Sequence, residues 1–161
     1  MLARLYGRLP ILATLASRRW VADVLHIPWS PARVPVAEAT VALVTSAGVH
    51  LKRDDPFDMG NPEGDPSFRV IPGDSAVHDL TITHDYYDHW PADRDVNCVF
   101  PLERLRELAA AAKVGRVARR HIGTMGHILG AQERRLVTET APAIARLLLD
   151  DDVDYVVAAP G

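Results

Sequence analysis

The stretch VALVTSAG, residues 41–48, predicts the fold more directly than any other part of the chain. Its first four residues form a continuous apolar run, which is typical of a strand that is buried on both faces. The next four, Thr45, Ser46, Ala47 and Gly48, are small and lead into a loop. A buried strand that runs into a small-residue loop is the usual beginning of an open α/β sheet, where ligands bind at the carboxyl ends of the strands.

Further strands and helices are predicted on the carboxyl side of this first strand. Strands are expected at 69–72, at 79–83, at 97–100 as a short extended piece, and at 153–159 as a buried strand. One helix begins after Pro101 and is capped by Gly115, and a second spans 131–149, where Pro142 implies a kink or a later start. Residues 117–126 read as a short strand and a glycine loop. The fold class is therefore α/β, an open, mostly parallel sheet with flanking helices, Rossmann-like or flavodoxin-like in three layers.

The length of 161 residues indicates a single domain. We assign residues 28–161 to the α/β domain and residues 1–27 to an N-terminal helical segment. Leucines recur in that segment at three- and four-residue spacing, which favours an amphipathic helix. Arg4 and Arg8 precede an apolar run, so a signal or transit peptide is the alternative.

The composition excludes several classes of protein. With 24% charged and 48% hydrophobic residues the chain is not disordered, and its net charge of −3 argues against a general nucleic-acid binder. No stretch approaches the roughly 18 apolar residues of a membrane span, so we expect no membrane partner. The single cysteine, Cys98, cannot form an internal disulfide, which favours a cytoplasmic location. It lies in an apolar run and is predicted to be an inert, buried thiol.

Residues 84–89, HDYYDH, form the block best suited to chemistry. Histidine titrates near neutrality, a carboxylate can fix its tautomer, and tyrosine can donate a proton. The alternative is a polar loop without a chemical role. Residues 52–68 are a second polar stretch, either a binding loop or a surface excursion. The chain contains no HxH, HExxH or CxxC spacing, so we assign no metal ligand.

Four stretches, taken together, resemble a known family. They are VALVTSAGVHLKRDDPFDMGNPEGDPSFRVIP (41–72), DLTITHDYYDHWPADRDVNCVFPLERLREL (79–108), VGRVARRHIGTMGHI (114–128) and VDYVVAAPG (153–161). In order and spacing they are similar to the B-subunit, or selenoprotein B, family of glycine, sarcosine, betaine and D-proline reductases. The resemblance covers roughly residues 28–161.

This resemblance implies an oxidoreductase that cleaves a C–N bond of a small amine and forms a disulfide from a dithiol. A selenocysteine or cysteine attacks the carbon next to the leaving amine, because the anion of such a residue is a strong nucleophile. The family also implies a partner subunit that holds the amine through a pyruvoyl group, and a thioredoxin-like or dithiol reductant. The family's nucleophile lies just after the strand matched by VDYVVAAPG, so we expect this chain to be a fragment, inactive alone.

Site residues are expected where the predicted strand ends meet. His84 is the expected catalytic residue, and it would protonate the leaving amine or lower the pKa of the nucleophile. The expected substrate-binding residues are Thr45, Ser46, Gly48, Tyr87, Asp88, Met125 and Gly126. Two other functions stay open. One is a non-catalytic binding module of the same fold, and the other is a metal-dependent hydrolase that uses His84, Asp88 and His89.

Overall fold

The computed structural model describes residues 30–161, so the segment at 1–27 lies outside the described residues. The central sheet contains β1 (Thr40–Thr45), β3 (Phe68–Pro72), β5 (Arg116–Val117), β6 (Arg120–Thr124) and β7 (Tyr155–Ala159). A separate sheet is formed by β2 (Val49–Leu51) and β4 (Leu80–Ile82). The helices are α3 (Trp90–Arg94), α4 (Leu102–Ala110), α5 (Gly130–Arg135) and α6 (Ala141–Asp150). A π-helical turn spans Leu136–Thr140, and 3-10 turns span Val36–Glu38, Val77–Asp79 and Val96–Cys98.

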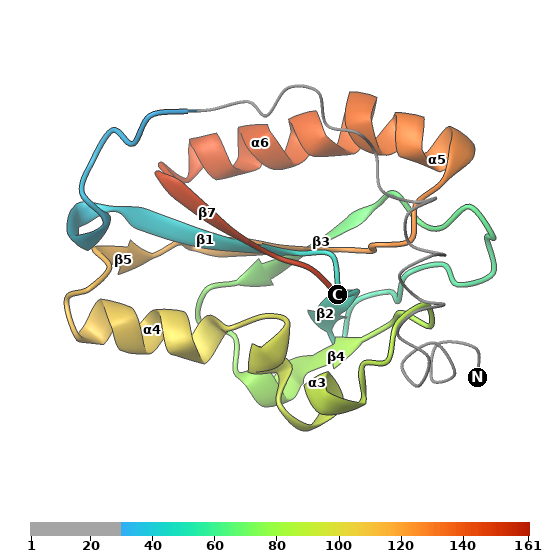
Figure 1. The fold of residues 1–161 in the computed structure, drawn as a ribbon, viewed down its shortest axis with the longest axis horizontal. Coiled ribbons are helices and arrows are strands. Elements are labelled where there is room, and N and C mark those ends of the chain that lie inside the picture. Colours follow the sequence, from blue (N-terminus) through green and yellow to red (C-terminus); the bar gives the residue numbers. More distant parts are fainter. Residues whose placement is uncertain (1–29) are drawn as a thin grey trace, which may run out of the picture.

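Parallel pairing dominates the central sheet. β1 pairs in parallel with β5, β6 and β7, and β3 runs antiparallel to β6. Helix α4 lies on one face of the sheet, and α5 and α6 lie on the other (Figure 1). The predicted α/β class, a mostly parallel sheet with flanking helices, is confirmed.

The side chains of β1 alternate between the two faces of the sheet. Val41 and Leu43 pack in an apolar cluster that includes Leu102 and Leu105 of α4. Ala42 packs in a second cluster with Leu148 of α6. Because helices cover both faces, every position of this strand must be apolar or small, which explains the continuous run VALV.

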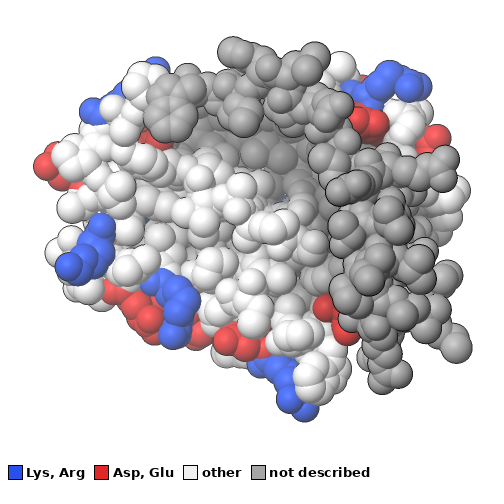
Figure 2. All heavy atoms as spheres, in the orientation of Figure 1, with Lys and Arg blue, Asp and Glu red and all other residues white. Residues whose placement is uncertain are grey.

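The strand predicted at 153–159 exists as β7, but the prediction that it is buried is wrong. Val156 is 47% exposed and Val157 is 44% exposed. Among the described residues β7 pairs with β1 alone. It therefore lies at the edge of the described sheet, and the surface around it carries few charges (Figures 1 and 2).

Two predicted extended segments have a different place or form. The strand predicted at 79–83 is confirmed as β4, but it pairs antiparallel with β2 outside the central sheet. The prediction at 97–100 is wrong, since Val96–Cys98 is a 3-10 turn. The Asp95 side chain accepts the Asn97 N–H at 3.0 Å and so stabilises this turn. Cys98, at its end, is exposed, so the predicted buried thiol is also wrong.

Both predicted helices are present, with different ends. Helix α4 stops at Ala110, and the left-handed residue that follows its C-cap is Ala112, with φ of 54°. Gly115 is therefore not the cap; a Cβ there would lie 2.3 Å from the carbonyl carbon of Glu38. The helix predicted at 131–149 is α5, the π-helical turn and α6. Pro142 lies in the first turn of α6, directly after the π-helical turn. Proline has no backbone N–H, and the wider π-helical turn accommodates the hydrogen bond that is lost.

His121 completes the ladder between β1 and β6 from inside the core. Its Nδ1 accepts the backbone N–H of Leu43 at 2.9 Å, so the ring proton lies on Nε2. Nε2 has no hydrogen-bond partner among the described residues. Burial, with a smaller contribution from the Arg106 charge, lowers the pKa of His121 to about 4. The ring is therefore neutral at pH 7.

The substitution Gly123→Ala tests how closely the backbone of β6 approaches the backbone of β2. A Cβ on Gly123 would lie 1.9 Å from the carbonyl oxygen of Val49, a backbone atom that cannot rotate away. We expect Gly123→Ala to lower the free energy of unfolding by at least about 1–3 kcal/mol, the usual cost of overpacking. Urea unfolding measures this. Gly60→Ala, whose Cβ would meet only the Asp58 side chain, is the matched control. Equal midpoints for the two variants would contradict the packing described.

The buried histidines predict how stability depends on pH. The folded-state pKa values of His84 and His121 are both about 4, below the ordinary value of 6.5. Between these values the unfolded chain binds more protons than the folded chain, so stability is fully present above pH 6.5 and is lost as pH falls toward 4. Each histidine contributes a slope of up to about 1.4 kcal/mol per pH unit in this window. Urea midpoints that do not change from pH 7 to pH 5 would refute this.

Candidate functional site

The carboxyl ends of β1, β6 and β7 meet at one edge of the sheet, because the three strands are parallel. The Ser46 N–H donates to the Ala159 carbonyl at 3.1 Å, and the Gly161 N–H lies 3.3 Å from Ser46 Oγ. Ala47 forms an isolated antiparallel bridge with Met125. The small-residue loop after β1 is thus held between the segments that follow the other two strands.

Gly48 connects this edge to the small sheet. Its N–H donates to the Thr124 carbonyl at 2.9 Å, and its own carbonyl accepts the Thr83 N–H at 2.9 Å. Its φ is +72°, and a Cβ would lie 2.4 Å from the Thr83 oxygen and 2.9 Å from the Cβ of His84. Only glycine permits this approach, and it brings the residue after β4 to the end of β1.

His84 lies at the centre of the site. Its side chain is 4% exposed, and its Nε2 is 3.1 Å from the Gly126 N–H while its Nδ1 is 3.2 Å from the Tyr86 N–H. Burial, and then the neighbouring His127 and His89, lower the pKa of His84 to about 4, against a smaller opposing effect of Asp85. The ring is therefore neutral at pH 7, and it can offer one lone pair and one N–H.

Tyr87 packs directly against His84. The two rings meet edge to face with centroids 5.0 Å apart, and the Tyr87 hydroxyl donates to the Ala47 carbonyl at 3.0 Å. Burial, and then Asp93, raise the pKa of Tyr87 to about 12. Tyr87 therefore keeps its proton at neutral pH and ties the 84–89 segment to the loop after β1.

The structure brings together most of the residues expected from the sequence. Those that converge are Thr45, Ser46, Gly48, His84, Tyr87, Met125 and Gly126. Thr45 and Met125 are buried beneath this surface. Asp88 does not join them. It is exposed and accepts the Trp90 N–H at 3.4 Å, at the beginning of α3.

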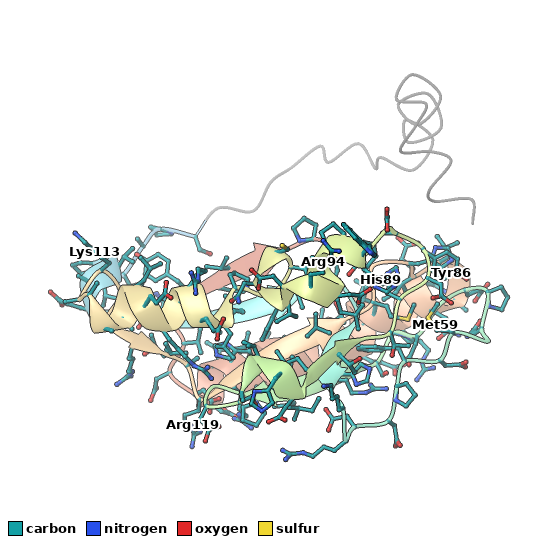
Figure 3. All side chains as sticks on the ribbon, turned by 90° about the horizontal axis from the view of Figure 1, so that it is seen from below. Met59, Tyr86, His89, Arg94, Lys113 and Arg119 are labelled. Carbon is teal, nitrogen blue, oxygen red and sulfur yellow. The ribbon has the colours of Figure 1, made fainter. Side chains whose placement is uncertain are left out.

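An aromatic pair beside the site was not predicted. Tyr86 stacks on His127 with ring centroids 3.7 Å apart and an angle of 13° between the planes. His127 also contacts the Pro62 carbonyl through Nε2 at 3.1 Å, so the 52–68 loop reaches the site edge. Figure 3 shows Tyr86, His89 and Met59 at the same end of the molecule, far from Lys113. No spacing rule links positions 86 and 127, which only the fold brings together.

The Glu63 region fixes the 52–68 loop in place. The Glu63 carbonyl accepts the Leu129 N–H at 2.8 Å, and its carboxylate accepts the Ala131 N–H at 3.2 Å. Gly64, with φ of +83°, lies so close to the His127 carbonyl that a Cβ would be 1.9 Å from its oxygen. The loop is therefore anchored to residues 127–131, the segment that follows Gly126.

Two further features bear on the alternatives. Within residues 30–161 no three His, Cys, Asp or Glu side chains are grouped so as to hold a metal ion, so the hydrolase alternative gains no geometric support. In the same part of the chain no helix is both long and apolar enough to cross a membrane.

Comparison with known proteins identifies the family of the chain. The chain is 41% identical over 133 residues to D-proline reductase subunit gamma of Acetoanaerobium sticklandii, covering 83% of this chain and 53% of that protein. It is 32% identical over 111 residues to the glycine reductase complex component B subunit gamma of Carboxydothermus hydrogenoformans, covering 63% of this chain and 24% of that protein. The chain thus spans about half of the first relative and a quarter of the second. No solved structure matches it. Residues 20–160 match the family of the glycine/sarcosine/betaine reductase selenoprotein B, and the chain belongs to this family.

Proposed function

We propose that this chain forms part of a reductase subunit that cleaves the C–N bond of a small amine with electrons from a dithiol. Its relatives are named as subunits of D-proline reductase and glycine reductase. A thiol-dependent reductase needs a site that stabilises an anionic nucleophile at neutral pH. The sheet edge around His84 offers uncharged N–H and O–H groups that can donate hydrogen bonds to such an anion.

One observation carries the proposal. Gly161 lies against Ala47, and its N–H lies 3.3 Å from Ser46 Oγ. A Cβ at Gly126 would lie 3.5 Å from Ser46 Oγ and 3.5 Å from His84 Nε2. The resemblance to the family implies a selenocysteine or cysteine just after this strand. A residue that follows Gly161 would therefore start its path beside Ser46, Gly126 and His84.

The proposed reaction adds two electrons and two protons to the substrate. The nucleophile's anion attacks the carbon, the C–N bond breaks, and the amine leaves with the bonding pair and takes up a proton. A thiol then attacks the bound sulfur or selenium, the carbon leaves as a carbanion and is protonated, and a dithiol ends as a disulfide. The amine would be held by a pyruvoyl group of a partner subunit, and this chain's residues act on the nucleophile.

The neutral ring of His84 favours one of its two expected roles. Because the pKa of the His84 ring is about 4, almost none of it is in the protonated imidazolium form at pH 7. It therefore cannot act as the general acid for a leaving amine. Its remaining N–H can still donate to an anion. We therefore assign His84 to stabilising the anionic nucleophile, with Tyr87 holding the ring in place through its edge-to-face contact.

The experiment measures amine-dependent oxidation of dithiothreitol by the assembled reductase that contains this chain, with D-proline and glycine as separate substrates. We expect His84→Gln to reduce turnover about 10²-fold, the usual scale for loss of such a group. Asp88→Asn is the matched control within the same segment, and it should change turnover less than about threefold because Asp88 does not reach His84. Absence of dithiol oxidation with either amine, or full turnover of His84→Gln, would reject the proposal.

A further inference from the structure

A cavity of about 440 Å³ lies between β4 and residues 92–96, which form the end of α3 and the start of the next 3-10 turn. This volume is within the usual range of ligand sites, about 300–1,000 Å³. Figure 1 shows β4 beside α3, across the molecule from α6. None of the residues that converge around His84 lines the cavity, so it is a separate feature of the described structure.

The cavity follows the main-chain edge of β4. Leu80, Thr81 and Ile82, the whole of this strand, line it, although successive side chains of a strand point to opposite faces. A cavity that touches every residue of a strand lies along its edge. Among the described residues β4 pairs with β2 alone, so this second edge carries no strand. The cavity is therefore a groove beside an open strand edge.

The hydrogen bonds of β4 show which of its main-chain groups face the groove. The Thr83 N–H donates to the Gly48 carbonyl at 2.9 Å, on the side of β2. Because residues of an antiparallel strand bond alternately to its two sides, Leu80 and Ile82 face away from β2. The Leu80 N–H donates to the Val77 carbonyl of the preceding 3-10 turn. Within residues 30–161 the Leu80 carbonyl, the Ile82 N–H and the Ile82 carbonyl have no hydrogen-bond partner.

The basic side chains that line the groove already have partners. Lys52 Nζ donates to the His78 carbonyl at 2.6 Å. The Arg94 guanidinium stacks on the Trp90 ring, 3.7 Å from its centroid.

The two aspartates that line the groove keep acceptor capacity. One oxygen of Asp93 pairs with His89 Nδ1 at 2.9 Å. One oxygen of Asp95 accepts the backbone and side-chain N–H groups of Asn97, at 3.0 and 2.9 Å. In the described part of the chain the second oxygen of each carboxylate has no such partner. Residues 74–95, which include β4 and α3, contain six aspartates and one arginine. Complementary charge therefore favours a basic occupant.

We propose that this groove binds an extended, basic segment of a partner subunit, which adds to β4 as a further strand and places an arginine or lysine against Asp93 and Asp95. In such strand addition the main-chain hydrogen bonds provide affinity, and the side chains beside the strand provide specificity. The existence of a partner subunit rests on the proposed function. Binding of a basic strand is measured on this chain alone, so its failure is distinct from failure of the reductase proposal.

Two pentapeptides with acetylated and amidated ends test the groove. One is Thr-Val-Arg-Val-Thr, and the other has glutamate in place of arginine. Each is titrated into the ¹⁵N-labelled full chain at pH 7 and followed by nuclear magnetic resonance. We expect the arginine peptide to shift the Thr81 and Ile82 amides in a saturable manner and to slow hydrogen exchange of the Ile82 N–H. The glutamate peptide should bind at least about threefold more weakly, because its charge is that of the aspartates.

Two sets of variants separate the contributions of the main chain and of charge. Ile82→Pro removes the outward N–H but no hydrogen bond to β2, and it should bind the arginine peptide at least about fivefold more weakly than its control Ile82→Ala. The double variant Asp93→Asn, Asp95→Asn leaves the strand intact and should weaken binding about two- to fivefold. Its control is Asp74→Asn, at an exposed position outside the groove, which should bind normally.

Three results would overturn the inference. They are the absence of saturable binding of the arginine peptide, equal affinity for the two peptides, and resonance shifts that are confined to residues outside the groove.

Discussion

The pair of backbone hydrogen bonds made by Gly48 is the interaction on which the site depends. Its N–H reaches Thr124 at the end of β6, and its carbonyl receives the N–H of Thr83 at the end of β4. One residue thereby joins the central sheet to the small β2–β4 sheet. The positive φ and the absence of a side chain are both required, since a Cβ would overlap Thr83 and His84. Together with the Tyr87 hydroxyl on the Ala47 carbonyl, this junction holds His84 at the end of β1.

Burial at this junction sets the chemistry of His84. Enclosed by Tyr87, Gly126 and the turn to Tyr86, the ring cannot be hydrated as a cation, and its pKa falls to about 4. A site that is rich in donors and carries no formal charge on its central ring is suited to holding an anion, whereas a protonated histidine would act as an acid. The neutral ring and the donors around it thus both support the role proposed for His84, which is to stabilise an anionic nucleophile.

Much of the site could be predicted from strand ends. Residues 45–48 and 125–126 follow strands that the sequence identified, and parallel strands place such residues at one edge. His84 was predicted from its chemistry and follows β4, yet β4 is not in the central sheet. Its arrival at the same edge depends on Gly48. Asp88 does not lie among these residues, since its carboxylate accepts the backbone N–H of Trp90 at the beginning of α3. The stacking of Tyr86 on His127 joins residues far apart in sequence, which no local pattern encodes.

The amino-acid sequence by itself determined the class of the fold, the family, and the residue types available for chemistry. These depend on local periodicity, on small residues after strands, and on long blocks of similarity. Tertiary structure alone decided which side chains meet, that Cys98 and β7 are exposed, and that His84 is neutral. The physical reason is that burial and hydrogen-bond partners arise from contacts between distant segments. A pKa is a property of those contacts and not of the residue.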